Sequence, residues 1–124
     1  MKKKIICFDI DNTICKTLSN KYKFSKPYLN KIQLINYLYN NNYYIKLFTS
    51  RYMGRNNEKK KFAIQQGFKF TKKQLKTWKI KYHELIFGKP SFDLYIDDKN
   101  LGFNKNWHEI LKKKLNIKNS WNQL

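Results

Sequence analysis

The hydrophobic positions of this chain form short runs that are separated by polar segments. Four runs are rich in branched and aromatic side chains, which is typical of buried strands, and they cover residues 4–9, 43–49, 84–87 and 93–97. Between and after these runs, apolar residues at helical spacing and helix-boundary signals predict helices. The predicted helices begin near Ser25-Lys26-Pro27, run over residues 57–66, open at residues 71–74 and run over residues 105–115.

Two of these helices have marked boundaries. Gly67 is expected in the position just past the end of helix 57–66, where glycine is common. Thr71 and Gln74 match a capping box, T-x-x-Q, at the start of the next helix. The order of strands and helices predicts an α/β fold with a largely parallel sheet. The link over residues 88–92 is too short for a parallel crossover, so one of the last two strands is expected to be irregular or antiparallel.

Length and composition bound the class of protein. The 124 residues predict one domain over residues 1–124, and the 41% apolar and 17% aromatic content is sufficient for a core. No apolar run is long enough to span a membrane, and Asp9 and Asp11 interrupt the run that a secretory signal would need. The two cysteines, Cys7 and Cys15, do not form a disulfide framework. We therefore expect a soluble, cytoplasmic protein that does not bind membranes.

The net charge of +19 is large. A nucleic-acid footprint normally gathers basic residues on one face, whereas the lysines are spread along this chain. Only two of the 27 basic residues are arginines, Arg51 and Arg55, and both follow the second strand. Because arginine offers a planar charged fork for phosphate or carboxylate, both are candidates for substrate binding, with helix capping or a surface ion pair as the alternative.

The acidic residues are few but clustered. Four of the eight form two groups, Asp9 with Asp11 and Asp97 with Asp98, and each group ends an apolar run. The other two strands are followed by polar candidates, since Thr49 ends the second and Lys89 follows the third. Ligands of open α/β sheets bind at the carboxyl ends of the strands. These side chains are therefore expected to share one site.

The acidic spacing has a chemical use. Residues two apart on a strand face the same way, about 6.5 Å apart, so Asp9 and Asp11 can flank one reacting group. Bringing them near Asp97 and Asp98 would cost about 4 kcal/mol per pair at 4 Å and an effective dielectric constant of 20. A divalent cation relieves that repulsion, and oxygen ligands suit Mg²⁺.

Four segments in order resemble the motifs of the haloacid dehalogenase-like phosphatase superfamily. Residues 8–14, Phe-Asp-Ile-Asp-Asn-Thr-Ile, look like its D-x-D-x-T motif, and Leu-Phe-Thr-Ser at 47–50 resembles its second motif. Gly-Lys-Pro at 88–90 is placed like its third motif, and Leu-Tyr-Ile-Asp-Asp at 94–98 is similar to its fourth. The resemblance implies a three-layer α/β/α, Rossmann-like core.

The resemblance also implies roles at the matching positions. Asp9 would be the nucleophile that forms an aspartyl-phosphate, and Asp11 would be the general acid and base. Thr49 would bind a phosphoryl oxygen, and Lys89 would neutralise charge. Mg²⁺ would be held by the Asp9 carboxylate, the Asp11 backbone carbonyl and a carboxylate of the fourth motif, Asp97 or Asp98.

The chain has no room for the cap domain of larger members, because the segments 11–26 and 50–57 are short. It is similar to the capless hydrolases encoded with capsule and surface-polysaccharide enzymes, on the segments 49–57 and 81–85. This implies a Mg²⁺-dependent phosphomonoesterase for a small phosphorylated metabolite, such as a sugar or polyol phosphate. Ser50, Arg51 and Arg55 are the candidate substrate-binding residues, and a second copy of the chain is a candidate cover for the open site.

Two other functions fit some of these features. The positive charge is compatible with an enzyme or binding protein that acts on nucleic-acid phosphate ends or nucleotides. A response-regulator-like receiver also phosphorylates an aspartate, but its motifs run in a different order, with the lysine last.

Overall fold

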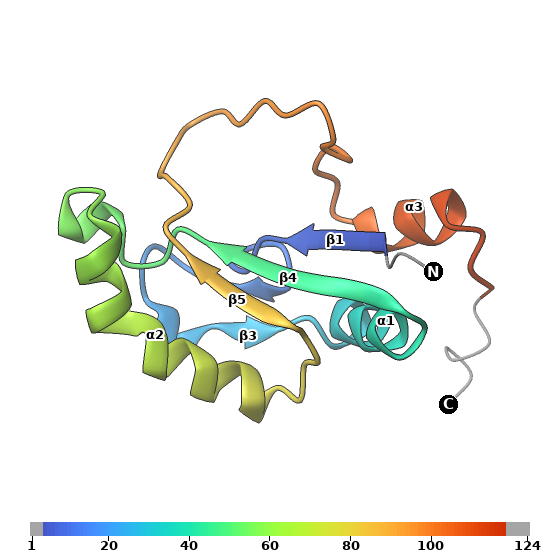
Figure 1. Cartoon of the computed structure of the whole chain (residues 1–124), viewed down its shortest axis with the longest axis horizontal. Helices are drawn as coiled ribbons and strands as arrows, with labels where there is room; N and C mark the ends of the chain where they lie inside the picture. The colour runs from blue at the N-terminus through green and yellow to red at the C-terminus, as the bar shows by residue number, and fades with distance from the viewer. Residues whose placement is uncertain (1–3, 119–124) are drawn as a thin grey trace. The chain divides into compact units, whose positions relative to one another are not determined.

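The computed structural model of the protein describes residues 4–118, which divide into two compact units, one up to Phe92 and the other from Asp93 (Figure 1). The first unit contains a parallel sheet in the order β1-β4-β5. Its strands are β1 (Lys4–Phe8), β4 (Tyr43–Thr49) and β5 (Glu84–Phe87). Three of the four predicted strands are thus confirmed.

The register of the sheet brings the strand ends level with one another. Phe8 of β1 lies opposite Leu47 of β4, and Thr49 of β4 lies opposite Phe87 of β5. Ile45, Leu47 and Thr49 alternate as buried positions along β4, as expected when side chains point to alternate faces. The residues that follow β1 and β5, and the last residue of β4, therefore meet at one edge of the sheet.

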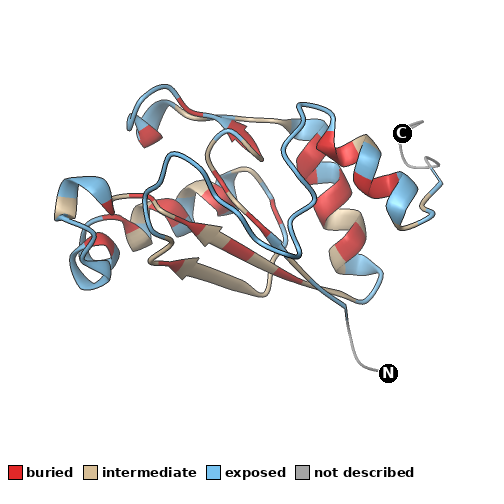
Figure 2. Ribbon diagram, turned by 90° about the horizontal axis from the view of Figure 1, so that it is seen from above, coloured by how far each residue is buried: buried red, intermediate tan, exposed pale blue. Residues whose placement is uncertain are grey.

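Two helices accompany the sheet. In α1 (Leu29–Asn40), Leu34, Ile35 and Leu38 are fully buried, and this helix contacts β4. The helix α2 (Lys60–Thr77) buries Ala63 and Leu75 and contacts β5. The helices carry both buried and exposed residues (Figure 2). The buried residues of α2 recur every four positions, which is the stripe expected of a helix packed on a core.

The helix predicted to begin at Ser25-Lys26-Pro27 begins instead at Leu29. Lys26–Pro27 forms β3, which pairs antiparallel with β2 (Cys15–Lys16). The backbone N–H of Tyr28 donates to the carbonyl of Ile14 over 2.9 Å, so this segment is held extended until the helix starts. We call residues 15–27 the flap; it also contains the short 3-10 helix η1 (Tyr22–Phe24).

The two helices predicted around Gly67 form one continuous helix, α2, so both predicted boundaries are wrong. Gly67 is buried inside α2, and a Cβ atom there would overlap the ring of Tyr52. Glycine at this position permits close packing of the helix rather than ending it. Thr71 and Gln74 do not cap a helix either, since both contact Arg51.

The second unit contains α3 (Trp107–Lys114), close to the helix predicted over residues 105–115. The strand predicted over residues 93–97 is wrong, because this segment is irregular and its Leu94 and Ile96 side chains are 78% and 86% exposed. This agrees with the short link that made a regular parallel strand doubtful. Within the described residues of this unit no strand is present to pair with it.

The mixed α/β class and the parallel sheet are confirmed, and the three-layer arrangement and the single domain stay predictions. Among the residues with a described structure, no helix combines the length and the apolar character that a membrane span requires.

Candidate active site

Asp9 follows β1 directly and keeps a partly open carboxylate. Its side chain is 31% exposed, and its Oδ1 lies 3.4 Å from Nζ of Lys89. Oδ2 accepts a hydrogen bond of 3.0 Å from the hydroxyl of Thr13. Burial raises the pKa of Asp9 above its usual value, while the charge of Lys89 and the Thr13 hydroxyl act in the opposite direction. The Asp9 carboxylate therefore contacts Lys89 and Thr13 and stays partly exposed to solvent.

Thr49 and Lys89 meet beside Asp9 through the backbone. The N–H of Lys89 donates to the carbonyl of Thr49 over 3.2 Å, and Gly88 before it turns with a positive φ of 101°, a conformation that favours glycine. This turn directs the lysine toward Asp9. The Thr49 hydroxyl is buried and accepts the N–H of Arg51 over 3.0 Å.

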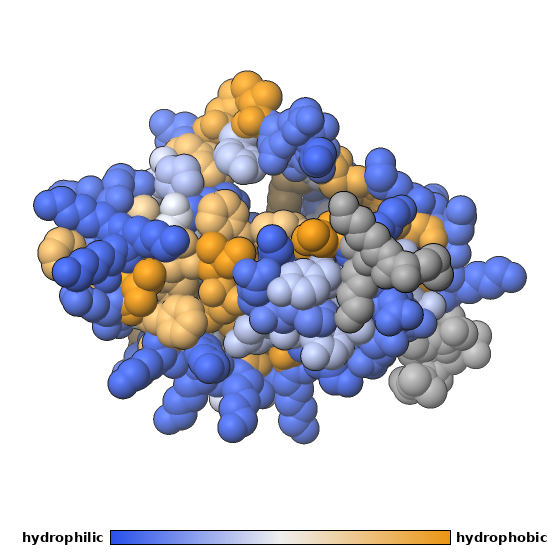
Figure 3. All heavy atoms as spheres, in the orientation of Figure 1, coloured by the Kyte–Doolittle hydropathy of each residue, from blue (hydrophilic) through white to orange (hydrophobic). Residues whose placement is uncertain are grey.

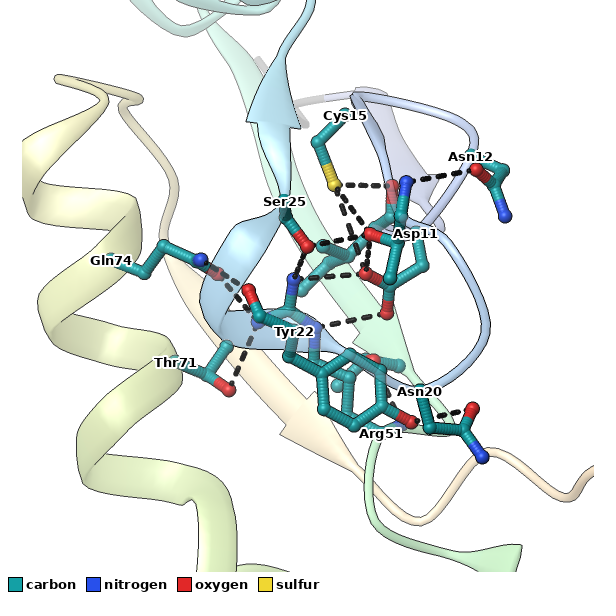
Figure 4. Close-up of polar contacts among 12 residues, drawn as sticks. Asp11, Asn12, Cys15, Asn20, Tyr22, Ser25, Arg51, Thr71 and Gln74 are labelled. Carbon is teal, nitrogen blue, oxygen red and sulfur yellow. Dashed lines mark hydrogen bonds and ion pairs between the residues drawn. The ribbon is translucent and has the colours of Figure 1, made fainter.

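Asp11 has a different environment from Asp9. Arg51 grips its carboxylate with two parallel hydrogen bonds of 2.9 Å, from Nε to Oδ2 and from Nη2 to Oδ1 (Figure 4). The Thr17 hydroxyl of the flap donates to Oδ1 over 2.6 Å. Asn12, which follows Asp11 with φ 63°, accepts the Thr17 N–H on its side-chain oxygen. The flap and the loop after β4 thus hold Asp11 from two sides.

Of the predicted substrate-binding residues, Arg51 is buried, with 1% of its surface exposed, and its guanidinium is occupied by protein groups. Its observed contacts favour a role inside the protein, and substrate binding by Arg51 stays a prediction. Arg55 is exposed and donates to the carbonyl of Asn20 over 3.0 Å, so it also holds the flap. Ser50 accepts the N–H of Met53 on its carbonyl over 3.1 Å, which shapes the loop after β4.

Asp97 and Asp98 lie in an exposed turn of the second unit. The Lys99 backbone N–H donates to the Asp97 carboxylate over 3.1 Å and lowers the pKa of Asp97. The structure therefore brings together Asp9, Asp11, Thr49 and Lys89, all in the first unit. The predicted fourth motif belongs to the second unit, where it forms an exposed acidic turn.

The donors at the sheet edge fit Mg²⁺ in part. The half-open Asp9 carboxylate and the Asp11 backbone carbonyl are the oxygen ligands that Mg²⁺ prefers, and this ion commonly keeps several waters and binds substrate phosphate as well. The Asp11 side chain is engaged by Arg51, which leaves its backbone for a metal. Over residues 4–118, neither unit gathers three acidic, histidine or cysteine side chains into a metal-binding group.

Sequence reasoning missed most of the supporting residues. Thr13 is the last residue of the D-x-D-x-T motif, and the sequence pattern does not predict its hydrogen bond to Asp9. The spacing of Thr71 and Gln74 predicts a helix cap, whereas in the structure both side chains contact Arg51. Thr17 and Tyr22 of the flap had no signal in a single sequence, since their contacts depend on how the flap folds back.

Comparison with known proteins adds fold information only. No protein-family model matches the chain, and no curated protein matches it. Among solved structures, the chain is similar to a structural-genomics target from Vibrio cholerae, with a TM-score of 0.74 and 21% sequence identity. That similarity covers 90% of this chain and 98% of the other, so the two proteins share a fold.

Proposed function

We propose that this protein is a Mg²⁺-dependent phosphomonoesterase of the haloacid dehalogenase-like type, with a three-layer Rossmann-like core and no cap domain. The observation that carries the proposal is the meeting of Asp9, Thr49 and Lys89 from three different strand ends. Lys89 reaches Asp9 with its ammonium group, 3.4 Å away, and Thr49 with its backbone N–H. A carboxylate beside a buried hydroxyl and a cation suits the capture of a phosphoryl group.

The reaction has two steps. In the first, an Asp9 oxygen attacks phosphorus, a new P–O bond forms, and the bond to the leaving oxygen breaks while Asp11 gives that oxygen a proton. In the second, Asp11 takes a proton from water, the water oxygen attacks phosphorus, and the bond to Asp9 breaks to release inorganic phosphate. Lys89 and the Thr49 hydroxyl stabilise the charge that develops on the phosphoryl oxygens.

Mg²⁺, when bound, supplies the positive charge that lets a carboxylate approach an anionic phosphate. The Asp9 carboxylate and the Asp11 carbonyl are the ligands that the first unit offers. Asp97 or Asp98 is proposed as a further ligand on the basis of the motif order alone.

The proposed substrate is a small phosphorylated metabolite of the cytoplasm, such as a sugar or polyol phosphate used for capsule or surface-polysaccharide synthesis. A second copy of the chain is a candidate cover for the site. These details depend on the resemblance of the sequence to capless hydrolases, and a panel of phosphorylated sugars, polyols and nucleotides would test them.

The central test is turnover of p-nitrophenyl phosphate by the full chain with Mg²⁺, with EDTA, and by the Asp9→Asn variant. We expect turnover only for the unaltered chain with Mg²⁺. Equal rates in all three samples would rule out the proposed chemistry.

A second function, binding of single-stranded nucleic acid, is favoured by one surface feature. Along α2, Lys69, Lys72, Lys73 and Lys76 line a hollow of about 460 Å³ together with Ile80 and Tyr82. Figure 3 shows hydrophilic side chains projecting from this part of the molecule beside an apolar area. Lysines along a groove with an aromatic ring suit a phosphate backbone and a stacked base.

This second function is tested with a fluorescent single-stranded oligonucleotide. Four charge reversals in the hollow are compared with four at exposed lysines of the second unit, which change the net charge equally: Lys69, Lys72, Lys73 and Lys76 against Lys105, Lys113, Lys114 and Lys118. Loss of the four contacts should reduce the slope of log affinity against log salt by about 3. An equal effect of both sets would show attraction by net charge without a site.

A further inference from the structure

Arg51 is the most deeply buried charged side chain beside the proposed site. It is 1% exposed, and its fork matches the two oxygens of Asp11 at 2.9 Å each. A bidentate arginine–carboxylate pair fixes the plane of the carboxylate as well as its position. The orientation of Asp11 therefore follows the orientation of Arg51.

The other side of the guanidinium is held by α2 and by the flap. Nη1 donates to the side-chain oxygen of Gln74 over 2.6 Å and lies 3.4 Å from the Thr71 hydroxyl. The Tyr22 ring covers the guanidinium at 4.8 Å, and Gln74 also donates to the Tyr22 carbonyl over 2.8 Å (Figure 4). Groups other than Asp11 thus fix the position of Arg51, so Arg51 is able to hold the Asp11 carboxylate in place.

The contacts distinguish the two oxygens of Asp11. Oδ1 accepts hydrogen bonds from Nη2 of Arg51, from the Thr17 hydroxyl and, over 3.7 Å, from the Cys15 thiol, so both of its lone pairs are engaged. Among the described residues, the donor to Oδ2 is Nε of Arg51, so one lone pair of Oδ2 stays available. The Asp11 side chain is 21% exposed, which leaves it accessible to a substrate or a water.

We infer that Arg51 is a positioning residue that orients Oδ2 of Asp11 toward the leaving-group oxygen of the substrate. Gln74 and Thr71 of α2 in turn fix the position of the Arg51 guanidinium. This inference rests on the proposed function, because it assigns Arg51 a task only if Asp11 exchanges a proton with the substrate. It also explains why a chain with 27 basic residues uses an arginine at this point, since lysine cannot grip both oxygens in one plane.

The test compares two phosphate esters that differ in their need for a proton. The leaving group of p-nitrophenyl phosphate departs as an anion, whereas an alkyl phosphate such as glycerol phosphate needs general-acid help. We expect Arg51→Gln to lower kcat on glycerol phosphate by roughly 10²-fold and on p-nitrophenyl phosphate by less than about 10-fold. Arg51→Lys, which keeps the charge but not the fork, should fall between these values.

Arg55→Gln is the matched control. Arg55 is the other arginine of the same loop, and it contacts the flap at Asn20 and Tyr22. The side chains that donate to the Asp11 carboxylate are instead Arg51, Thr17 and Cys15. We expect Arg55→Gln to change kcat by the same factor on both esters. Digestion by trypsin at the exposed Lys21 and Lys23 reports flap loosening without any turnover, and it separates a loosened flap from a misplaced Asp11.

Gln74→Ala keeps the test usable if Arg51→Gln does not fold. It leaves the ion pair intact and removes the 2.6 Å contact behind it, together with the hydrogen bond from Gln74 to the Tyr22 carbonyl of the flap. The same preference for p-nitrophenyl phosphate should appear, at several-fold, and trypsin digestion of this variant reports the part of the effect that comes from the flap. Equal losses on both esters for the Arg51 and Gln74 variants would overturn the inference and leave Arg51 a structural residue. An unaltered protein that cleaves neither ester would overturn the proposed function, and this inference with it.

Discussion

Asp9 and Asp11 are two residues apart at the end of one strand, yet their surroundings differ strongly. Asp9 has a lysine at 3.4 Å and a hydroxyl at 3.0 Å, and its side chain is 31% exposed. Asp11 has two arginine hydrogen bonds of 2.9 Å and a hydroxyl at 2.6 Å. The Asp9 carboxylate thus has few and longer contacts, whereas the Asp11 carboxylate is fixed in position by several short hydrogen bonds.

The difference matches what each carboxylate is proposed to do. A nucleophile has to move from its resting partner to phosphorus, and a flexible lysine, whose ammonium is a point charge, permits that movement. A group that exchanges protons must stay where the leaving oxygen and the water will be, and a planar fork keeps it there. The predictions that follow test this contrast.

The largest effect is expected at Asp9. Asp9→Asn removes the nucleophile and should lower phosphatase activity by about 10⁴-fold or more, with no phosphate retained on the protein. Asp11→Asn should still capture phosphate from p-nitrophenyl phosphate, so intact-mass spectrometry after rapid quenching should show an added phosphate. Phosphate on the Asp9→Asn variant would place the nucleophile elsewhere.

Lys89 should have the next largest effect. Lys89→Ala removes the cation 3.4 Å from Asp9, and kcat/KM should fall by about 10²- to 10³-fold on both kinds of ester, as for other preorganised charge-stabilising groups. Lys46→Ala is the control, because Lys46 pairs with Glu84 on the sheet at 3.8 Å. A comparable loss in Lys46→Ala would point to a general effect of charge.

The third prediction concerns the support on the Asp11 side. In Gly67→Ala the new Cβ meets the Tyr52 ring, whose centroid lies 4.9 Å from that of Tyr22 in the flap, with the two rings tilted at 51°. We expect the free energy of unfolding to fall by about 1–3 kcal/mol, because overpacking has this cost and outweighs the better helix propensity of alanine. In the control Gly54→Ala the nearest atom lies 3.8 Å away, and a change below about 1 kcal/mol is expected in urea unfolding.

The smallest effect is a dependence of stability on pH. Burial raises the pKa of Asp9 above 3.8, so the folded state holds this proton more tightly than the unfolded state. The contribution of Asp9 to stability is therefore present below pH 3.8 and is lost as the pH rises through the folded pKa. In EDTA, Asp9→Asn should be more stable than the unaltered protein at pH 7, and the difference should close near pH 4. A less stable variant at pH 7 would contradict this.

The sequence predicts the elements whose periodicity is local. The apolar runs of β1, β4 and β5 are strands, and the polar residues at their ends, Asp9, Thr49 and Lys89, lie together because parallel strands end at one edge. Asp9, Asp11, Thr49 and Lys89 are therefore predictable as a group from the strand order, whereas the predicted place of Asp97 and Asp98 beside them stays a prediction.

Features that depend on contacts between distant segments escaped prediction. Gly67 and Thr71 carry the local signals of a helix end and a helix start, but packing against Tyr52 and Arg51 keeps α2 continuous through both. The segment 93–97 has the composition of a strand, and its Leu94 and Ile96 are exposed in the second unit. Composition describes what a segment is able to form, whereas a strand also needs a neighbour.

The flap is fastened at rest by side chains from α2 and from the loop after β4. Because the flap is ordered before a ligand binds, it loses little conformational entropy on binding, which favours affinity for a ligand that fits it. We therefore expect any selection that the flap makes among ligands to take place at the binding step, ahead of the chemistry.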